Sequence, residues 1–386
     1  MDFEDIVRKA ETDVGHRSAD SGAALHLDGF KKLYEGVCAD RELSDSGAIR
    51  AKQALFERIR AYLIFQRDFE RYPEIRSTQI HRPLFILDSG RTGSTLLQAL
   101  LALDEQARTP RRWELVAPSP PPRPETYASD QRIELVAKSL RNLASLVPDI
   151  LKAHPIAADS ADECHWMMSH GTHNFVYYRY PGYWQWFSSL GDRQLLALYQ
   201  QYRRQVQHLT VFMSGGHWLS KSPVHRQFSS VLPAVFPDFT AVRLHRRPTQ
   251  CIPSLASLIA KVRSLSYPAV NKAEIGQDVL THFVEGVRRM MQVDTPERSG
   301  RFVDLSYEDL VADPVGSIAA IYAQLDYDFT DRFRRAIRQY LVGVEAAPAF
   351  AHRYTFEEYG LSRDTIEASC AGYIAWANKK GVRLAA

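Results

Sequence analysis

Residues 88–95, DSGRTGST, have the composition of a loop that binds an anion. They follow the apolar segment Leu84–Leu87 and precede Leu-rich residues at helical spacing, which predicts a strand, a tight turn and a helix. The first backbone N–H groups of such a helix have no internal partners, and the helix dipole favours negative charge there. Gly90 and Gly93 permit the turn, and the hydroxyl of Ser94 can add a donor.

The loop differs from that of proteins that hydrolyse nucleoside triphosphates. Their P-loop carries a lysine on the terminal phosphates. Here Ser94 stands at the lysine position, and Asp88 stands where the first glycine would be. Arg91 is the one cation in the run. We therefore expect an anion held by backbone amides and an arginine, and the competing interpretation is an ordinary turn with an exposed arginine.

The elements around this loop alternate along the chain. Residues 1–80 have the spacing of helices, and four later segments that read as strands are each followed by a helix: Leu84–Leu87, Trp218–Lys221, Ala241–His245 and Arg301–Leu305. This alternation predicts an α/β fold with a central parallel sheet flanked by helices. We expect an N-terminal helical region at 1–80 and an α/β domain with C-terminal helices at 81–386. Residues 131–186 read as mostly helical, and the prolines of 117–125 predict a loop of unassigned role.

Composition narrows the class of protein. The chain has 386 residues, 45% of them hydrophobic, and a net charge of +3 with no basic stripe, so we expect no nucleic-acid partner. The four cysteines form no CxxC pair, and the N-terminus has no signal-peptide pattern, which predicts a cytoplasmic protein. No apolar run is long enough for a transmembrane helix. The oligomeric state is not encoded in any pattern, and a homodimer is one option.

The loop resembles the 5′-phosphosulfate loop of sulfotransferases that use 3′-phosphoadenosine-5′-phosphosulfate (PAPS), in the form where arginine replaces the more usual lysine. Four further segments are similar to motifs of this family, in the expected order: LHRRP through Ser254, with Arg246 and Ser254 eight residues apart; SYEDL followed by DP, with Tyr307; WLSKSP, ending at Lys221; and HRY with FEEYGL, beginning at His352 and Arg353. The last two are typical of a bacterial branch. The likeness covers roughly residues 30–376.

The resemblance implies a P-loop-like sulfotransferase fold, PAPS as cosubstrate, no required metal and a small-molecule acceptor. It also places the acceptor side of the site, or a lid, at the N-terminal helices. The residues it implies for donor binding are Arg91, Thr92, Gly93, Ser94, Thr95, Leu96, Arg246, Ser254, Tyr307, His352 and Arg353. An arginine stays charged at neutral pH, so we assign Arg91 an electrostatic role on the phosphate oxygens. Lys221 is the second cation expected on the sulfuryl group, unless it is a solvated lysine at a strand end.

The acceptor hydroxyl needs a general base, and the sequence leaves several candidates open. Glu114 occupies a place at which a related branch carries a catalytic glutamate, although it could instead pair with Arg111 or Arg112. His225, close after Lys221, is the main rival. His154 and His165 are lesser candidates.

The segment 165–187 is dense in histidines and aromatic residues. The spacing of His165, His170 and His173 does not place them on one helical face, so we expect no metal site. The aromatic residues predict core packing first, and a pocket for an apolar or phenolic acceptor second. The alternatives to a sulfotransferase are a P-loop kinase, which needs a lysine at position 94, and a non-catalytic nucleotide-binding protein.

Overall fold

The computed structural model describes residues 2–17, 23–146, 156–168, 178–213, 215–345 and 354–384. The strands are β1 (Leu84–Leu87), β2 (Ala107–Arg108), β3 (His217–Lys221), β4 (Thr240–His245) and β5 (Phe302–Ser306). The α-helices are α1 (Phe3–Val14), α2 (Ala23–Ala39), α3 (Asp45–Arg71), α4 (Ser94–Leu101), α5 (Arg112–Val116), α6 (Gln131–Leu146), α8 (Tyr183–Ser188), α9 (Asp192–Thr210), α10 (Leu232–Val235), α11 (Pro248–Arg263), α12 (Lys272–Gln292), α13 (Tyr307–Ala312), α14 (Pro314–Gln324), α15 (Asp331–Glu345) and α16 (Arg363–Lys379). Short 3-10 turns include η1 (Pro73–Ser77), η3 (Cys164–Trp166) and η5 (Pro223–Phe228).

The five strands form one parallel sheet in the order β2-β3-β1-β4-β5, which confirms the predicted α/β fold with helices around a parallel sheet. β1 lies at the centre, between β3 and β4. The anion loop that follows β1 therefore opens at the middle of the sheet edge where the strands end, the usual place for a ligand in such folds. β2 was not predicted because two residues carry no periodicity.

Alternate residues of each strand belong to two separate cores. On β1, Phe85 and Leu87 pack with the core that contains α3, α9, α11 and α12, whereas Leu84 and Ile86 pack with the core beneath α4, α14 and α15. This is the period of two that side chains on a strand must have. Both faces of the sheet are therefore covered, which explains why the strands read as continuous apolar runs.

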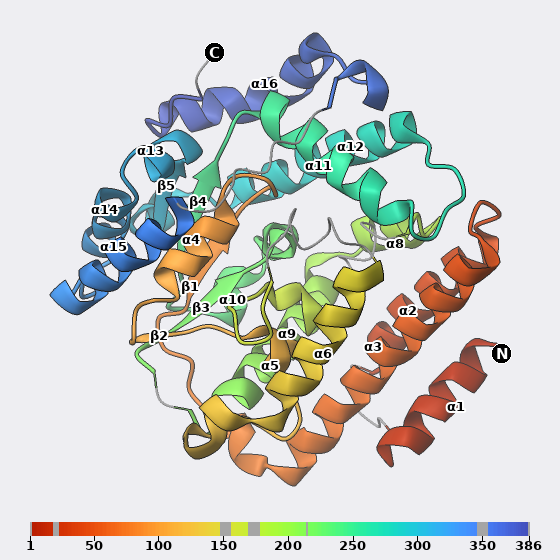
Figure 1. The fold of residues 1–386 in the computed structure, drawn as a ribbon. Helices are drawn as coiled ribbons and strands as arrows, with labels where there is room; N and C mark the ends of the chain where they lie inside the picture. The colour runs from red at the N-terminus through yellow and green to blue at the C-terminus, as the bar shows by residue number, and fades with distance from the viewer. Residues whose placement is uncertain are drawn as a thin grey trace.

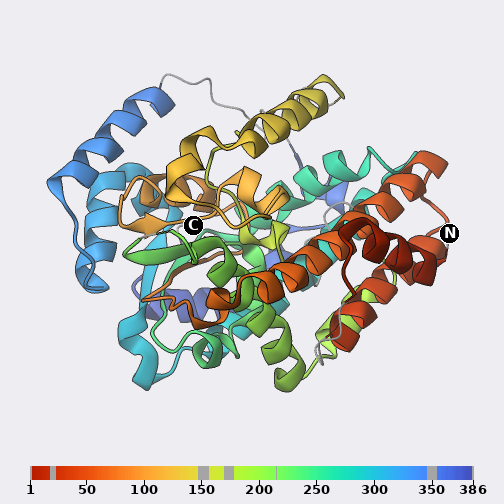
Figure 2. The same cartoon turned by 90° about the horizontal axis from the view of Figure 1, so that it is seen from below.

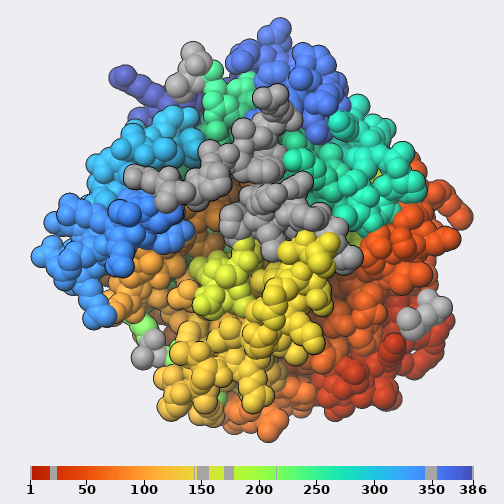
Figure 3. All heavy atoms as spheres, in the orientation of Figure 1, coloured from red at the N-terminus to blue at the C-terminus, as the bar shows by residue number. Residues whose placement is uncertain are grey.

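The helices divide between the two faces as the cores require. Figure 1 shows α13, α14 and α15 together on one side, with α11, α12 and α16 above the sheet and the N-terminal helices on the other side. α1 lies along α3 in both cartoon views (Figures 1 and 2). In the space-filling view, α6 and the N-terminal helices adjoin at the lower part of this face (Figure 3). Side chains of α1 to α3 share a core with the sheet, and the division at residue 80 remains a prediction.

One helical prediction is wrong in part. The pattern of residues 131–186 reads as mostly helical, yet α6 ends at Leu146 and the described residues 156–163 are not helical. Instead Ala161 pairs with Arg111 in an isolated antiparallel bridge, and the amide of Arg112 donates to the carbonyl of Ser160 at 3.0 Å. The backbone conformation of residues 156–163 is therefore set by pairing with the segment before α5. This pairing leaves Glu163 in contact with Lys221 at the end of β3.

A buried ionic network attaches α16 to the sheet. The guanidinium of Arg243 on β4 donates from Nε to Asp304 at 2.7 Å and from Nη1 to Asp294 at 2.8 Å. His245 bridges Asp304 to the hydroxyl of Tyr373 on α16, with both contacts at 2.8 Å. Burial raises the pKa of Asp304, but its bonds to His245 and Arg243 outweigh this and leave the pKa below its usual value. Arg243 thus pairs with both aspartates beneath the site, and Lys380 pairs with Asp294 as well.

Candidate active site

The loop between β1 and α4 has a tightly specified backbone. Gly90, Arg91 and Gly93 have φ values of +79°, +60° and +88°, all in the left-handed region. Glycine adopts this region freely, whereas arginine does so at a cost and only where its surroundings hold it. The carbonyl of Arg91 accepts a hydrogen bond from Nη1 of Arg246 at 3.0 Å. The Nε of Arg91 donates to Oγ of Ser254 at 3.2 Å. Contacts to the start of α11 thus fix the loop.

Asp88 explains both departures from the P-loop pattern. Its Oδ2 accepts from the backbone N–H of Gly90 at 3.0 Å and from Oγ of Ser94 at 2.7 Å. The carboxylate therefore closes the turn, and the hydroxyl of Ser94 donates within the loop and not toward a ligand. Thr92 is buried beside the same carboxylate, 3.4 Å away through its Oγ1. The hydroxyl that is exposed at the start of α4 belongs to Thr95, and among the described residues no side chain caps the first amides of this helix.

Residues from three distant motifs converge on this loop. Arg246 reaches Arg91 and also stacks its guanidinium over the ring of Tyr307, with its Cζ 4.0 Å from the ring centroid. A Cβ at Gly93 would lie 2.7 Å from Cδ2 of Tyr307, so only glycine fits there. Arg91, Gly93, Arg246, Ser254 and Tyr307, all named above as expected donor contacts, therefore lie together, while Leu96 is half-buried on α4.

The charges at this point favour an anion. Burial lowers the pKa of Arg91, and the neighbouring charge of Arg246 lowers it further. Two guanidinium groups that approach each other next to uncapped helix amides repel one another, and a bound polyanion would remove that repulsion. The donor set of these arginines, the amides of α4 and the hydroxyls of Ser254 and Thr95 suits phosphate or sulfate oxygens.

Lys221 is buried at the end of β3, where it pairs in register with Ile86 of β1. Burial opposes its charge, but the carboxylates of Glu163 and Asp88 outweigh burial and raise the pKa of the ammonium group. Lys221 also lines a small cavity with Thr95 and Gln98 of α4, which joins it to the anion loop. It is thus an inward-facing cation at the loop, and the interpretation as a solvated lysine is wrong.

Glu163 is a residue of this site that sequence reasoning missed. It forms an ion pair with Lys221, and its Oε2 lies 2.8 Å from Nδ1 of His165. Glu163 lines the same cavity, next to Asp162, whose carboxylate binds Arg112 at 2.9 Å. Glu163 and Lys221 are 58 positions apart in the chain. The one signal in the sequence was a carboxylate beside the candidate His165, in a segment that reads as helical.

Glu114 lies in a different environment. It is fully buried and forms a two-pronged ion pair with Arg108, not with the side chains of Arg111 or Arg112. Its Oε2 also accepts from the backbone N–H of Arg111 at 2.7 Å and from the hydroxyl of Tyr127 at 3.0 Å. The carboxylate oxygens are thus occupied by donors, an arrangement that holds α5 against β2.

His225 is buried below the end of β3. Its Nδ1 is 2.9 Å from the hydroxyl of Tyr199 and its Nε2 is 2.9 Å from Oγ of Ser220, and the ring packs edge-on against Phe85. Burial lowers its pKa to about 3, and the neighbouring His165 lowers it in the same direction. Both ring nitrogens therefore have partners inside the core, on the face of the sheet that Phe85 covers.

Comparison with known proteins gives these features a context. The model of the sulfotransferase family matches residues 83–331, which is more than half of the chain. The chain belongs to the sulfotransferase family. Sequence relatives include omega-hydroxy-beta-dihydromenaquinone-9 sulfotransferase Stf3 of Mycobacterium bovis and of Mycobacterium tuberculosis, each 25% identical over 72% of this chain and 71% of its own length.

Solved structures agree with this assignment. Sulfotransferase STF1 from Mycobacterium tuberculosis superimposes with a TM-score of 0.84 at 25% identity, over 96% of this chain and 99% of its own. Sulfotransferase STF9 from Mycobacterium avium has the same fold, with a TM-score of 0.85 at 23% identity over 97% of this chain and 96% of its own. The predicted family, fold and enzyme class are thus confirmed.

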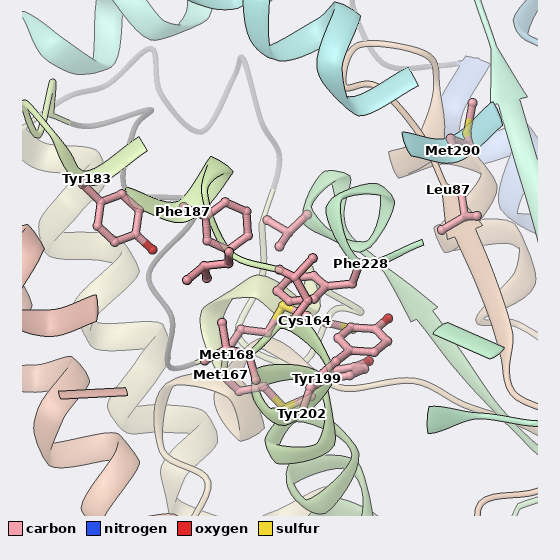
Figure 4. Close-up of a cluster of buried hydrophobic side chains, with 14 of the residues drawn as sticks. Leu87, Cys164, Met167, Met168, Tyr183, Phe187, Tyr199, Tyr202, Phe228 and Met290 are labelled. Atoms are coloured by element: carbon pink, nitrogen blue, oxygen red, sulfur yellow. The ribbon is translucent and has the colours of Figure 1, made fainter. Parts of the chain in front are cut away.

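The aromatic segment of this sulfotransferase is largely core in its described part. Tyr183 and Phe187 of α8 are buried, and Figure 4 shows Cys164, Met167 and Met168 near the rings of α9. His154, His170, His173, His352 and Arg353 lie outside the described residues. Within the described ranges, no three side chains of His, Cys, Asp or Glu are grouped to hold a metal, and no helix is long and apolar enough to span a membrane.

We predict that His225 stays neutral from pH 8 to pH 5, because its folded pKa of about 3 lies far below the 6.5 of an unfolded histidine. Between these values the unfolded chain binds a proton that the folded chain does not. The free energy of unfolding should therefore fall as the pH falls below 6.5, by about 1.4 kcal/mol per pH unit from this group. Ring ¹⁵N spectra would test this, with free histidine as the titration reference. A His225 ring that titrates between pH 5 and 8 would contradict the assignment.

Proposed function

We propose that this sulfotransferase moves a sulfuryl group from PAPS to a hydroxyl group of an apolar or phenolic small molecule. The observation that carries the proposal is the approach of Arg91 and Arg246 to each other at the uncapped start of α4. A nucleotide with phosphate groups at both its 5′ and 3′ positions supplies the negative charge that this arrangement lacks.

The donor would lie across the ends of β1 and β4. In this proposal Arg91, the amides from Gly93 to Leu96 and the hydroxyl of Thr95 hold the 5′ phosphosulfate. Arg246 and Ser254 hold the 3′ phosphate. The ring of Tyr307, which already stacks on Arg246, lies beside the adenine. Thr92 and Ser94 act indirectly in this scheme, because their hydroxyls lie with Asp88 inside the loop. His352 and Arg353 remain predicted donor contacts.

PAPS supplies an activated sulfuryl group, and the protein positions it and balances its charge. By analogy with phosphoryl transfer, charge grows on the leaving phosphate oxygen and is stabilised by cations and amides already in place. Arg91 is suited to that oxygen. Lys221 is suited to the sulfuryl oxygens, because two carboxylates keep its ammonium charged inside the fold. A sulfuryl group carries less charge than a terminal phosphoryl group, which fits a loop built without the P-loop lysine.

We propose Glu163 as the general base, in place of Glu114 and His225. Glu163 lines the cavity that also contains Lys221 and Thr95. Its carboxylate is therefore next to the cation that would hold the transferred group, on the side where a general base is needed. Glu114 is committed to Arg108, and His225 is enclosed by Tyr199 and Ser220. His165, 2.8 Å from Glu163, would orient the carboxylate.

The acceptor is proposed to be a lipid alcohol or a phenol. The Stf3 relatives are named for a sulfated menaquinone derivative, which bears a hydroxyl on an apolar chain. In this chain Ile156 and Ala161 line the cavity beside Lys221. The partly buried Trp166 lies five positions after Ala161 in the chain. A kinase is not supported, because Ser94 replaces the lysine that a P-loop kinase needs. A cytoplasmic location and a homodimer remain predictions.

The donor assignment predicts that 3′-phosphoadenosine-5′-phosphate (PAP) raises the melting temperature more than AMP does, because only PAP has the 3′ phosphate. Arg246→Ala should weaken PAP binding about 10- to 150-fold, the equivalent of about 1.5–3 kcal/mol for a charged hydrogen bond. Arg247→Ala, which removes the adjacent arginine, is the matched control and should bind PAP normally. If calorimetry gives the two variants equal affinity for PAP, Arg246 does not contact the nucleotide.

The base assignment predicts that Glu163→Gln lowers kcat about 10²- to 10⁴-fold while PAP still binds. Glu163→Asp should retain more activity than Glu163→Gln. The matched control is Glu114→Gln, which should lower the melting temperature, since it leaves buried Arg108 without its partner, but should keep kcat in the folded fraction. If Glu163→Gln turns over at the wild-type rate, or if Glu114→Gln folds normally without activity, the base is not Glu163.

The acceptor assignment predicts transfer of label from ³⁵S-PAPS to long-chain alcohols or phenols, and no transfer to free sugars. A panel of phenols, sterols, sugars and lipid alcohols tests this, with the Arg91→Ala variant as the background. Preferential labelling of sugars would show that the acceptor class is wrong while leaving the donor assignment intact.

A further inference from the structure

A second pocket, with a volume of about 660 Å³, lies between α3, η1 and α9. The side chain of Gln207 in its wall donates to the carbonyl of Thr78 at 2.7 Å, in the segment that leads into β1. α9 leads into β3, so the pocket lies toward the edge at which the strands begin. The anion loop opens at the opposite edge. Figure 2 views the molecule from the underside of Figure 1, where α3 crosses it.

Two helical faces line this pocket, and their side chains are polar except for that of Phe69. On α9 the stripe has the spacing i, i+3, i+4, i+7, which places four side chains on one helical face: Gln200, Arg203, Arg204 and Gln207. On α3 the stripe has the spacing i, i+3, i+4: Gln66, Phe69 and Glu70. η1 closes the pocket with Ile75 and Arg76. Two packed helices normally present apolar stripes to each other, so this lining departs from simple core packing.

Arginines outnumber carboxylates in the lining: Arg76, Arg203 and Arg204 line the pocket together with Glu70. The carboxylate of Glu70 lies 3.8 Å from Nδ1 of His16 at the rim. In the part of the chain that the structure describes, the guanidinium groups of Arg76 and Arg203 form no ion pair. Like charges gathered in a concave site raise the affinity for an anion.

A buried amide points to the same conclusion. The side chain of Gln66 lines the pocket, is only 6% exposed, and its Nε2 has no hydrogen-bond partner among the described residues. A buried donor without a partner is costly, and an acceptor oxygen in the pocket would satisfy it. Gln207, by contrast, uses its amide within the protein.

We propose that this pocket binds a small phosphate-bearing anion. A phosphate monoester carries about −1.5 to −2 charge at neutral pH, which the guanidinium groups of Arg76 and Arg203 can compensate. Guanidinium groups hold phosphate oxygens in pairs, and the amide of Gln66 supplies a neutral donor. The volume lies in the range of small-molecule sites, which leaves room for an organic group beside Phe69 and Ile75.

The test is calorimetric titration of inorganic pyrophosphate into the protein saturated with PAP, in about 0.15 M salt, so that the anion loop is occupied. We expect one further binding event with a Kd below about 1 mM. Arg203→Gln should weaken it at least about tenfold, as expected for a lost charged hydrogen bond. Arg193→Gln, an exposed arginine near the other end of α9, is the matched control and should bind as the wild type does.

The same titration into Arg246→Ala without PAP separates this site from the proposed donor site, since the further event should persist there. Gln66→Leu should weaken pyrophosphate binding without removing the positive charge. The proposal is overturned if the PAP-saturated wild type gives no binding event, or if Arg203→Gln and Arg193→Gln bind pyrophosphate equally well.

Discussion

Repulsion between two guanidinium groups, held together by the fold, is the feature on which the site depends. Arg91 and Arg246 come from motifs 155 positions apart, yet Nη1 of one donates to the carbonyl of the other at 3.0 Å. The contact is possible because β1 and β4 are adjacent parallel strands, whose ends carry both motifs to one edge. The fold thus places two positive charges at one edge of the sheet, where a bound anion would compensate both.

Two carboxylates, those of Asp88 and Glu163, determine which cations of the site are already paired within the protein. Asp88 draws the hydroxyl of Ser94 and the amide of Gly90 into the loop, and its charge also reaches Lys221. Glu163 pairs with Lys221 directly. Lys221 is therefore buried without losing its proton, whereas Arg91 and Arg246 keep no carboxylate partner at the loop within the described residues. In the proposed mechanism, this division leaves the arginines for the donor and places the carboxylate of Glu163 beside Lys221, where it would accept the proton of the acceptor hydroxyl.

Local patterns were enough to predict the elements that hold the donor loop. β1 occupies Leu84–Leu87 as expected. Arg91, Arg246, Ser254 and Tyr307, which the family resemblance singles out, lie close together at the edge where the strands end, and their role in donor binding stays a prediction. β2 escaped detection because two residues show no period.

Pairings between distant segments were beyond the reach of these patterns. The partner of Lys221 is Glu163, from a segment whose local pattern favours helix but whose backbone pairs with the residues before α5. Glu114 prefers Arg108 to the arginines next to it in the sequence, since β2 positions Arg108 against α5. The burial of His225 likewise results from packing of α9 against β3 and η5, which a reading of the KSPVH segment alone does not reveal.

The most direct test of the central claim is a crystal structure of the protein with PAP. The account predicts the 5′ phosphate at the first amides of α4 within hydrogen-bond distance of Arg91, the 3′ phosphate between Arg246 and Ser254, and the adenine beside Tyr307. Glu163 and Lys221 should face the open side of the 5′ phosphate. A nucleotide bound elsewhere, or one whose 3′ phosphate does not touch Arg246, would contradict the account.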